Sequence, residues 1–484
     1  MYKSLFLFSV LQITFLASFL YAKEKPNFVI VLADDVSWSS FGCFDSGLYT
    51  HTPNIDKLAS QGVQFTNFMC SVAQCGPIRH ELYTGLLPPT SGVYSNGSKP
   101  RGDYKNMANY LGELGYHVGL TGKAHFKRVS DFDKIEGFSS DGNSDNPTWE
   151  MNGIKKFIES SQSEEKPFCM VIASVHSHHP WTAGKASNFP VDKIVVPPHM
   201  VDGPVTREAL ATHAAEVEEL DHQVGATMKL LDDMNLSEDT VLIFLSEQGT
   251  AMPKGKWSIY DYGTRALCLA RWPGKFKAGE VTDAVAMYCD IVPTLMDIAG
   301  GEPPVIDGKS LFPVLKGETS DHRKHAYLVH QASGYSQRAI RNKEFKLMWN
   351  PKQENGYYVD TLMDPKSKKF FGLAWQEWVK KAEVNSDAQE KIDRVIKNPE
   401  FELYNIKNDP WEMTNLSNNP EYQSTLQEMH AQLKAEMERL NDTFSSHDPK
   451  VSKKEKKKME KTGESTEMKN RDKKKRMRDK KEKA

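Results

Sequence analysis

The sequence predicts an α/β fold in which helices flank a large, mostly parallel sheet. Three observations predict it: short runs of aliphatic and β-branched residues typical of strands buried on both faces, helical patterns between these runs, and a polar cluster directly behind each run. The strand-like runs are Phe28–Ala33, His117–Leu120, Phe168–Ala173 and Val241–Leu245.

Amphipathic spacing between the strand-like runs predicts helices. The segments that show this spacing are 54–61, 106–114, 206–234 and 288–299. Because strands joined through a crossover helix lie parallel in one sheet, we expect these elements to form one α/β domain over residues 23–325.

The pattern changes after residue 325, where short alternating stretches replace the apolar runs. The stretches are Tyr327–Val329, Arg338–Arg341 and Phe345–Trp349, and a helical pattern follows over 421–440. Alternation of this kind is typical of antiparallel strands. We therefore expect a smaller C-terminal subdomain over residues 326–448, built from an antiparallel sheet and a helix.

The N-terminus has the pattern of a secretory signal. Lys3 precedes the apolar run Leu5–Leu20, and the small residue Ala22 is followed by a charged stretch. The run is short for a membrane span, so a signal peptide over residues 1–22 is favoured over a membrane anchor. The mature protein is expected to be exported, to the periplasm or outside the cell, without stable membrane insertion.

The C-terminus is a basic tail over residues 449–484. From Lys450 onward it holds 17 Lys and Arg against 7 Asp and Glu, and it contains no aromatic residue. Such a segment cannot form a core, so we expect a disordered appendage. A solvated extension is the first interpretation, with weak capture of a polyanionic substrate as the alternative. No nucleic-acid partner is expected.

The polar clusters behind the four strand-like runs are expected to converge. They contain Asp34 and Asp35, then Gly122–His125, then His176–His179, then Ser246–Gly249. Ligands of open α/β sheets bind at the carboxyl ends of the strands. The four clusters therefore predict one polar crevice at that edge of the sheet.

Cys75 differs from the other cysteines of the chain. The six cysteines show no metal or disulfide spacing, and Cys169 and Cys268 lie in apolar runs typical of buried free thiols. Pro77 and Gly85 fit the two ends of a helix, so Cys75 is expected just before a helix N-terminus. A cysteine there is either a nucleophile of low pKa or an inert thiol in a turn.

The segment from Cys75 to Arg79, Cys-Gly-Pro-Ile-Arg, resembles the C-x-P-x-R signature of the type I, formylglycine-dependent sulfatases. Further segments match the motifs of that family in order, over about residues 26–420. They include Asp34-Asp35, Thr52–Asp56, Gly122–His125, His176–Trp181, Gly255–Trp257, Arg271–Gly274, Asp290–Thr294 and Glu402–Tyr404. The resemblance implies an alkaline-phosphatase-like fold and a sulfuric ester hydrolase of a bacterial, exported type.

The resemblance also implies a cofactor and a covalent modification. A maturation enzyme would oxidise Cys75 to formylglycine, and one Ca²⁺ ion would bind the oxygen donors around it. The implied ligands are Asp34, Asp35, residue 75, Glu247 and Gln248. Oxygen ligands suit a hard cation. Glu247 and Gln248 depart from the family pattern, because each is one methylene longer than the usual Asp and Asn.

The family mechanism assigns a role to each remaining motif residue. Hydrated formylglycine would attack sulfur, with Arg79 holding the diol and Lys123 and Lys256 the sulfate. His125 would then act as the base that expels sulfate. A second histidine would protonate the leaving alcohol, and alignment favours His178 over the alternative, His179.

The substrate implied by the resemblance is a sulfated oligosaccharide or polysaccharide, such as ulvan. His179, Trp181 and Arg265 are expected to contact the sugar, since aromatic and basic residues suit an anionic glycan. Two alternatives stay open. The same superfamily contains phosphate and phosphonate ester hydrolases, and a non-catalytic carbohydrate-binding relative would keep the fold.

Overall fold

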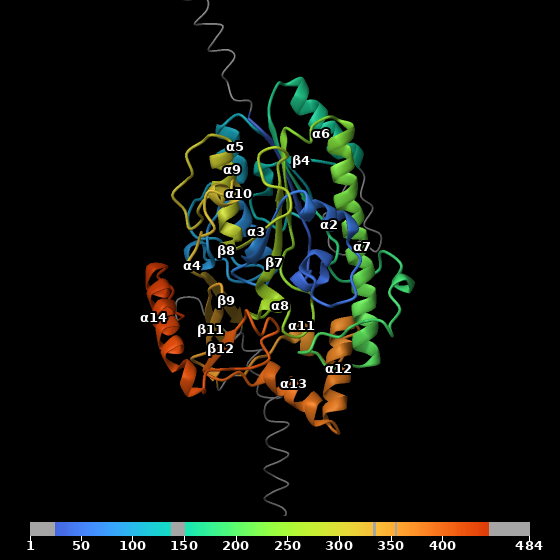
Figure 1. The fold of residues 1–484 in the computed structure, drawn as a ribbon, viewed down its shortest axis with the longest axis vertical. Coiled ribbons are helices and arrows are strands. Elements are labelled where there is room, and N and C mark those ends of the chain that lie inside the picture. Colours follow the sequence, from blue (N-terminus) through green and yellow to red (C-terminus); the bar gives the residue numbers. More distant parts are fainter. Residues whose placement is uncertain (1–24, 137–150, 333–334, 354–355, 445–484) are drawn as a thin grey trace, which may run out of the picture.

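The computed structural model describes residues 25–136, 151–332, 335–353 and 356–444 (Figure 1). The predicted signal peptide over 1–22 and the basic tail over 449–484 lie outside these residues. Among the helices of the described ranges, none combines the length and the apolar character needed to cross a membrane.

Eight strands form the main sheet, in the order β4-β3-β5-β1-β6-β7-β2-β8. Neighbouring strands pair in parallel, except that β7 runs antiparallel to both β6 and β2. The strands are β1 (Asn27–Leu32), β2 (Val63–Met69), β3 (His117–Gly122), β4 (Asp133–Lys134), β5 (Phe168–Ala173), β6 (Thr240–Leu245), β7 (Arg265–Arg271) and β8 (Glu280–Met287). The predicted large, mostly parallel sheet is therefore confirmed.

The four predicted strand-like runs are the four neighbouring strands β3, β5, β1 and β6. In the pairing register, Leu32 lies opposite both Ala173 and Leu245, so these strands end at the same level. Residues 28–32, 168–173 and 240–245 are buried throughout. Because the strands are adjacent, the residues that follow them reach one stretch of the sheet edge.

Helices cover both faces of the main sheet. They are α2 (Pro53–Ser60), α3 (Cys75–Thr84), α4 (Pro88–Ser91), α5 (Met107–Glu113), α6 (Met151–Ser163), α7 (Pro204–Asp233), α8 (Asp261–Thr264), α9 (Ile291–Ile298) and α10 (Phe312–Leu315). One hydrophobic cluster joins α3, α5 and α9 to one face, and a second joins α2, α6 and α7 to the other. Short 3-10 helices lie at Trp38–Ser40, Gly42–Phe44, Val129–Asp131, Ala186–Asn188, Tyr288–Asp290 and Pro420–Tyr422.

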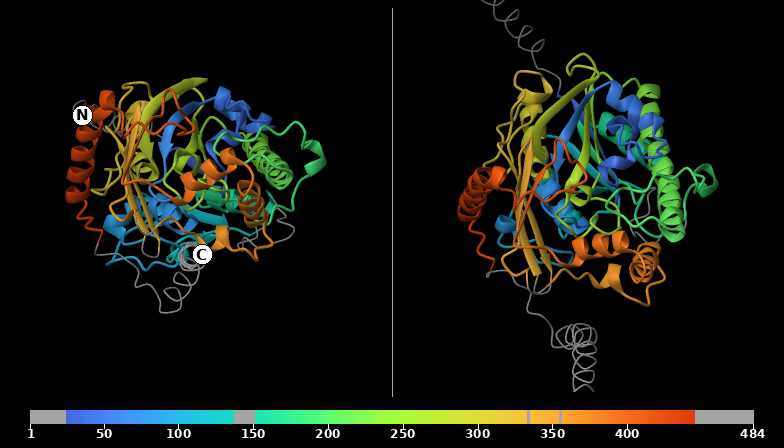
Figure 2. Two further views of the ribbon diagram at one scale, coloured as in Figure 1. Left: turned by 90° about the horizontal axis from the view of Figure 1, so that it is seen from below. Right: turned by 60° about the horizontal axis from the view of Figure 1, so that its bottom comes forward.

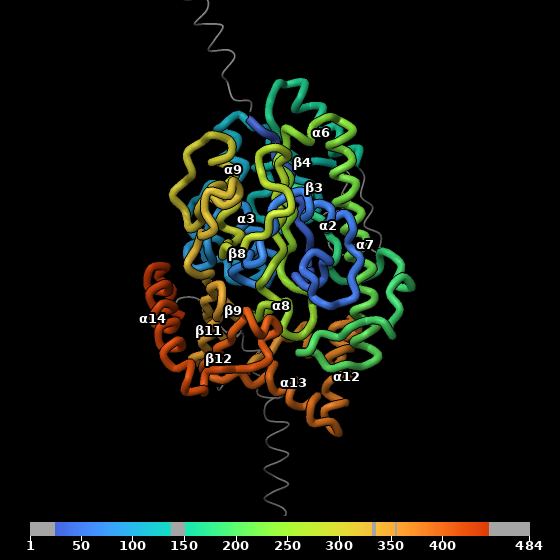
Figure 3. The backbone as a smooth tube through the Cα atoms, in the orientation of Figure 1, coloured from blue at the N-terminus to red at the C-terminus, as the bar shows by residue number. Residues whose placement is uncertain are grey.

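The long helix α7 lies beside α2, although about 150 residues separate them (Figure 3). The Asp221 carboxylate on α7 accepts hydrogen bonds from the backbone amides of Asn54 and Ile55, at 3.1 and 2.8 Å. Negative charge is favourable at the first turn of a helix. Asp221 therefore fixes α2 at its N-terminus.

A second sheet has the antiparallel order β12-β11-β10-β9. Its strands are β9 (Ala326–Ala332), β10 (Tyr335–Arg341), β11 (Phe345–Trp349) and β12 (Phe401–Asn405). Helix α14 (Gln423–Arg439) buries Met429 and Leu433 in the cluster that contains these strands, and Figure 2 shows the helix beside the sheet. The predicted C-terminal antiparallel sheet with a helix is confirmed.

Three helices that the sequence analysis did not predict lie between β11 and β12. They are α11 (Asp360–Met363), α12 (Phe370–Ala382) and α13 (Ser386–Ile396). Helix α12 packs against the start of α7 (Figure 2), where the indole nitrogen of Trp378 donates to Thr206 Oγ1 at 2.9 Å. The C-terminal part of the chain is thus attached to the helix that supports the main sheet.

Candidate active site

Cys75 is the first residue of α3, after the N-cap residue Gln74. The helix therefore starts at Cys75, whereas the sequence analysis expected the cysteine just before the helix. Pro77 lies in the first turn, where its missing N–H costs no hydrogen bond, and the C-cap Gly85 has a left-handed φ of 70°. The predicted ends of this helix are otherwise confirmed.

Polar side chains from separate parts of the chain surround Cys75 Sγ. The distances are 3.6 Å to Asp34 Oδ1, 3.7 Å to Asp35 Oδ1, 3.6 Å to Lys123 Nζ, 3.2 Å to Lys256 Nζ and 3.4 Å to Gln248 Nε2. All of these side chains are buried. Side chains from three of the four predicted polar clusters, those at Asp34-Asp35, Gly122–His125 and Ser246–Gly249, therefore meet around Cys75.

Backbone hydrogen bonds beyond the strand ends hold these residues in register. The amide of Ala33 donates to Leu245 O, and the amide of Lys123 donates to Ala173 O, both at 2.9 Å. The loop that carries Lys256 is tied to the segment before Cys75, because the amide of Trp257 donates to Ala73 O at 2.9 Å. The side chains are therefore placed by continuous backbone pairing.

The site balances buried acids against buried cations. Lys256 Nζ lies 2.7 Å from both carboxylate oxygens of Asp35, and Lys123 Nζ donates to Asp34 Oδ2. Burial alone would raise the pKa of Asp34, but the Lys123 ammonium and other neighbouring groups hold that pKa well below its usual range. Asp34 is therefore an anion at neutral pH.

Arg79 stands one helical turn after Cys75 and contacts the fourth strand end. Its Nε donates to Glu247 Oε1 at 2.6 Å, and its Nη1 donates to the carbonyl of Lys123. Burial raises the pKa of Glu247, although Arg79 lowers it. Arg79 thus links α3 to the residues that follow β3 and β6.

Two oxygen atoms of the site have no hydrogen-bond partner among the described residues. They are Glu247 Oε2 and Gln248 Oε1, and both are buried. A buried acceptor left unpaired costs free energy, so a ligand for these oxygens would be stabilising. Together with the carboxylates of Asp34 and Asp35 they form a donor set that fits a hard divalent cation.

The ligand atoms of Asp34, Asp35, Cys75 and His178 lie within 4.8 Å of one another. The cluster can therefore hold a metal ion. His178 Nε2 is 3.7 Å from Asp35 Oδ2, and its Nδ1 lies 2.6 Å from the carbonyl oxygen of His179. A carbonyl only accepts, so Nδ1 carries a proton and Nε2 faces the acidic side of the cluster.

The environment of Cys75 disfavours the interpretation of this residue as a nucleophile of low pKa. Burial raises the pKa of the thiol, and Glu247 raises it further, despite the nearby ammonium groups of Lys123 and Lys256. The thiolate is the nucleophilic form of cysteine. An unmodified Cys75 is therefore a protonated, buried thiol and not a nucleophile of low pKa.

His125 borders an open cavity beside Cys75. The cavity has a volume of about 350 Å³ and is lined by Gly76, Ser95, Ser98, His125 and Lys127 among others. Burial, reinforced by Lys123 and Arg79, lowers the pKa of His125 to about 4. The imidazole is therefore neutral at neutral pH and can accept a proton.

Two predicted sugar contacts have other roles in the structure. Trp181 is 3% exposed, and its indole nitrogen donates to Ser177 O at 2.9 Å. The Arg265 guanidinium lies over the rings of Trp38 and Phe44, and its Nε donates to Thr66 O at 2.7 Å. Both side chains are thus engaged in packing contacts, and neither is assigned to the sugar below.

His179 lies at the edge of the site, beside residues that the sequence analysis missed. Its ring packs edge-on against Phe371 at a centroid distance of 5.3 Å, and burial and Lys369 lower its pKa to about 4. Asn96 was also missed, and its Oδ1 accepts a hydrogen bond from the amide of Gly76 at 2.8 Å. No motif marks Asn96. Phe371 and Lys369 belong to the region around α12, which the sequence analysis did not predict.

The fold and the site define an α/β protein that gathers a thiol, acids and cations at the carboxyl edge of its sheet. A family model described as sulfatase matches residues 26–301, and one described as N-sulphoglucosamine sulphohydrolase, C-terminal, matches residues 255–397. The chain therefore belongs to the sulfatase family.

Curated relatives carry matching names. An ulvan-active sulfatase of Formosa agariphila is 30% identical over 359 residues, which cover 68% of this chain and 66% of that protein. Human arylsulfatase A is 27% identical over 385 residues, which cover 64% of this chain and 72% of that protein. The chain thus spans slightly under two thirds of the first of these relatives.

Solved structures share the fold at lower identity. One is a protein in complex with its substrate D-glucosamine-2-N,6-O-disulfate, with a TM-score of 0.65, 19% identity, and coverage of 87% of this chain and 99% of that one. Another is the phosphonate monoester hydrolase of Agrobacterium radiobacter, with a TM-score of 0.61 and 18% identity. The match covers 86% of this chain and 96% of that one. At these identities the likeness shows the fold alone.

Proposed function

We propose that this protein hydrolyses sulfate esters of a sulfated glycan, with formylglycine at position 75 and one Ca²⁺ ion. The observation that carries the proposal is the position of Cys75 at the start of α3, between two buried carboxylates and two buried ammonium groups. A sulfate ester is anionic, so a site that hydrolyses it needs fixed positive charge around the sulfur.

Three cations supply that charge from this chain. Lys123, Lys256 and Arg79 are held by Asp34, Asp35 and Glu247, so their positions are fixed before the substrate arrives. Preorganised charges need no reorganisation during the reaction, which is why they stabilise a transition state strongly. We assign Lys123 and Lys256 to the sulfate oxygens and Arg79 to residue 75.

The ligands that we assign to the Ca²⁺ ion are Asp34, Asp35, Glu247 and Gln248, with residue 75 as a further ligand. Glu247 Oε2 and Gln248 Oε1 support the assignment, because they are buried acceptors without a partner among the described residues. A bound Ca²⁺ ion would act as a Lewis acid that polarises oxygen atoms, and hydrated formylglycine would supply the attacking oxygen.

Two histidines are placed to move protons. His178 Nε2 lies on the acidic side of the cluster, 3.7 Å from Asp35 Oδ2, and we assign it to donate a proton to the leaving alcohol. The neutral imidazole of His125 is assigned to accept the proton that must leave residue 75 when sulfate is released. His178 is preferred to His179 because His179 packs against Phe371 and Trp181 instead.

The relatives and the chemistry of the site support a proposal for the substrate class. One relative is named an ulvan-active sulfatase, and the cavity beside His125 offers Lys127 and two serine hydroxyls to a polar, anionic ligand. We propose an oligosaccharide of a sulfated polysaccharide such as ulvan, acted on by an exported enzyme. A maturation enzyme that oxidises Cys75 is then a required partner.

Paired assays test the proposal. The protein, coexpressed with a formylglycine-generating enzyme, is assayed on 4-nitrophenyl sulfate and 4-nitrophenyl phosphate and on defined sulfated oligosaccharides, and the peptide containing residue 75 is weighed by mass spectrometry. We expect an aldehyde at position 75 and preferred release of sulfate. The Cys75→Ala variant is the matched control and should be inactive.

Other results would point to the alternatives. A preference for the phosphate ester would replace the sulfatase by a phosphate or phosphonate ester hydrolase. An unmodified Cys75 without turnover on any ester, together with retained glycan binding, would indicate a carbohydrate-binding relative.

A further inference from the structure

Helix α7 carries two buried polar side chains that contact the active-site backbone from outside the cluster around Cys75. They are His213, which is 3% exposed, and Glu216, which is 2% exposed. Residues three positions apart lie on the same face of a helix, so both point toward the sheet edge. The proposed chemistry gives neither of them a role.

His213 supports Asp35. Its Nε2 lies 3.2 Å from the carbonyl oxygen of Asp35 and 3.4 Å from Thr250 Oγ1, and the Trp181 indole packs edge-on against its ring. Because a carbonyl only accepts, Nε2 is the protonated nitrogen in this contact. His213 thus donates to the backbone of a residue whose side chain lies beside Cys75.

The backbone at Asp35 needs such support. Its φ is 50°, in the left-handed region that non-glycine residues seldom adopt. A conformation of this kind costs about 1–3 kcal/mol and persists where neighbouring groups hold it. The preceding residue is held as well, since Asp34 N donates to His176 O at 2.9 Å and Ser177 N donates to Asp34 O at 2.8 Å.

Glu216 holds the loop 176–183, which carries His178 and His179. Glu216 Oε2 lies 2.7 Å from His176 Nδ1, and Oε1 accepts the amides of Thr182 and Ala183, both at 2.6 Å. One carboxylate therefore pins both ends of this loop to α7.

We propose that His213 and Glu216 are positioning residues of the active site. His213 fixes the corner formed by Asp34 and Asp35, and Glu216 fixes the loop that presents His178. The inference rests on the proposed function of Asp35 and His178. Partners that orient metal ligands in this way are worth about 10–100-fold in metal affinity or activity.

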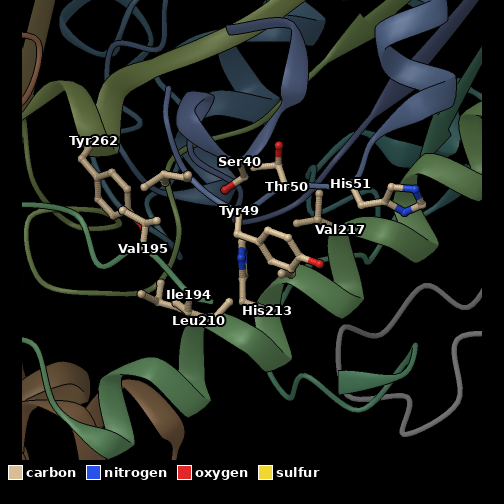
Figure 4. Close-up of a pocket in the computed structure, with 12 residues that line it drawn as sticks. Ser40, Tyr49, Thr50, His51, Ile194, Val195, Leu210, His213, Val217 and Tyr262 are labelled. Carbon is tan, nitrogen blue, oxygen red and sulfur yellow. The ribbon is translucent and has the colours of Figure 1, made fainter. Parts of the chain in front are cut away.

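The surroundings of His213 allow a clean substitution. Figure 4 shows His213 on α7 with Leu210 and Val217 of the same helix, around a small cavity of about 40 Å³ that Tyr49 and Tyr262 also line. Because His213 already borders empty space, an amide side chain can replace the imidazole without displacing its neighbours.

Two amide variants of His213 test whether the length of the side chain matters in addition to its polarity. Glutamine in His213→Gln places an amide nitrogen near the position of Nε2, whereas asparagine in His213→Asn ends short of the Asp35 carbonyl. We expect His213→Gln to stay within about threefold of the wild type, and His213→Asn to lose about tenfold in Ca²⁺ affinity and in kcat on 4-nitrophenyl sulfate, with KM little changed. Ca²⁺ affinity is measured by isothermal titration calorimetry.

His222 provides the matched control on the same helix. It is exposed and its Nδ1 lies 3.5 Å from Glu219 Oε2, away from the cluster around Cys75. The same two substitutions at His222 should change neither Ca²⁺ affinity nor kcat. Equal Ca²⁺ affinity and kcat in His213→Gln and His213→Asn would overturn the role of His213.

Glu216→Gln tests the second contact and covers the case in which His213→Asn does not fold. The amide keeps one oxygen for Thr182 N and Ala183 N but replaces the oxygen that faces His176. We expect a loss of about tenfold in kcat with a melting temperature close to that of the wild type. Wild-type kcat in Glu216→Gln would contradict its positioning role.

Since calorimetry needs no turnover, a protein that binds Ca²⁺ but hydrolyses no sulfate ester would refute the proposed function alone.

Discussion

Arg79 Nε lies 2.6 Å from Glu247 Oε1, and both side chains are fully buried. The pair joins the helix that presents residue 75 to the end of β6. Only one oxygen of Glu247 is used in this contact, since Oε2 has no hydrogen-bond partner among the described residues. The longer glutamate can therefore pair with Arg79 through one oxygen and bind a cation through the other.

Glu247→Ala should remove most of the metal affinity and the activity. It also leaves the Arg79 guanidinium buried with one partner fewer, and breaking a buried pair in this way costs about 3–5 kcal/mol. Calorimetric titration with Ca²⁺ and thermal unfolding measure the two effects. We expect both to be large, because the carboxylate pairs with Arg79 and would also bind the proposed Ca²⁺ ion.

Glu247→Gln and Glu238→Gln complete that series. The first leaves one amide oxygen, which can accept from Arg79 or bind the metal but cannot do both as fully as a carboxylate. It should therefore retain weak Ca²⁺ binding, poor catalysis and part of the stability. The second changes an exposed glutamate and should have no effect. Near-normal metal content and turnover in Glu247→Ala would place β6 outside the metal site.

The pH dependence of kcat/KM should reflect His125. The pKa of this imidazole is lowered to about 4 by burial and by Lys123 and Arg79. A base works in its neutral form, so kcat/KM on an aryl sulfate should be independent of this group above pH 4 and fall about tenfold per pH unit below it. His125→Asn should remove this limb of the profile, and a limb that survives in the variant would assign it to another group.

Stability should decrease as the pH falls from about 6.5 to 4. Burial lowers the pKa of His80 and His213 to about 4 and that of His330 to about 3, and holds that of His199 well below its usual value. In this window the unfolded chain binds protons that the folded chain does not, so each histidine removes about 1.4 kcal/mol of unfolding free energy per pH unit.

Urea unfolding at pH 7, 6 and 5 measures this slope. His330→Gln should reduce the slope by the contribution of one histidine. A free energy of unfolding that is flat between pH 7 and 5 would contradict the prediction.

Gly122→Ala should damage both stability and activity. Gly122 has a φ of 79°, and a Cβ there would lie 2.1 Å from the carbonyl oxygen of Ala173, the acceptor of the Lys123 amide. The strain should cost about 1–3 kcal/mol and displace Lys123. Gly112→Ala in α5 meets no atom within 4 Å and should stabilise the helix by about 0.5–1 kcal/mol. Chemical denaturation and kcat of both variants check the pair.

The strands at the centre of the sheet could be predicted because both of their faces are buried. Burial on two faces requires a continuous apolar run, which β1, β5 and β6 show. Strand β2 contains Asn67, whose amide donates to Asp283 O at 2.8 Å, and the first half of β8 alternates between partly exposed and exposed residues. In such strands, polar contacts and partial exposure interrupt the apolar residues. No continuous apolar run therefore predicts them.

The residues of the candidate site divide in the same way. Asp34, Lys123 and Glu247 follow apolar strands directly, so their position in the chain predicts their place at the sheet edge. His213 and Glu216 stand in an amphipathic helix, where a polar residue normally faces solvent. Their burial depends on which elements pack against α7, and the spacing of residues within the helix does not predict those elements.

Cys75 is 1% exposed in the folded protein, and the side chains around it come from residues as far apart as 34 and 256. Once these segments have paired, no second enzyme has access to the thiol. If Cys75 is oxidised as proposed, the order of events is therefore set: oxidation takes place on the nascent or translocating chain, and closure of the sheet follows. A maturation enzyme added to folded, unmodified protein should leave residue 75 a cysteine. The same enzyme added during refolding should oxidise Cys75 to formylglycine.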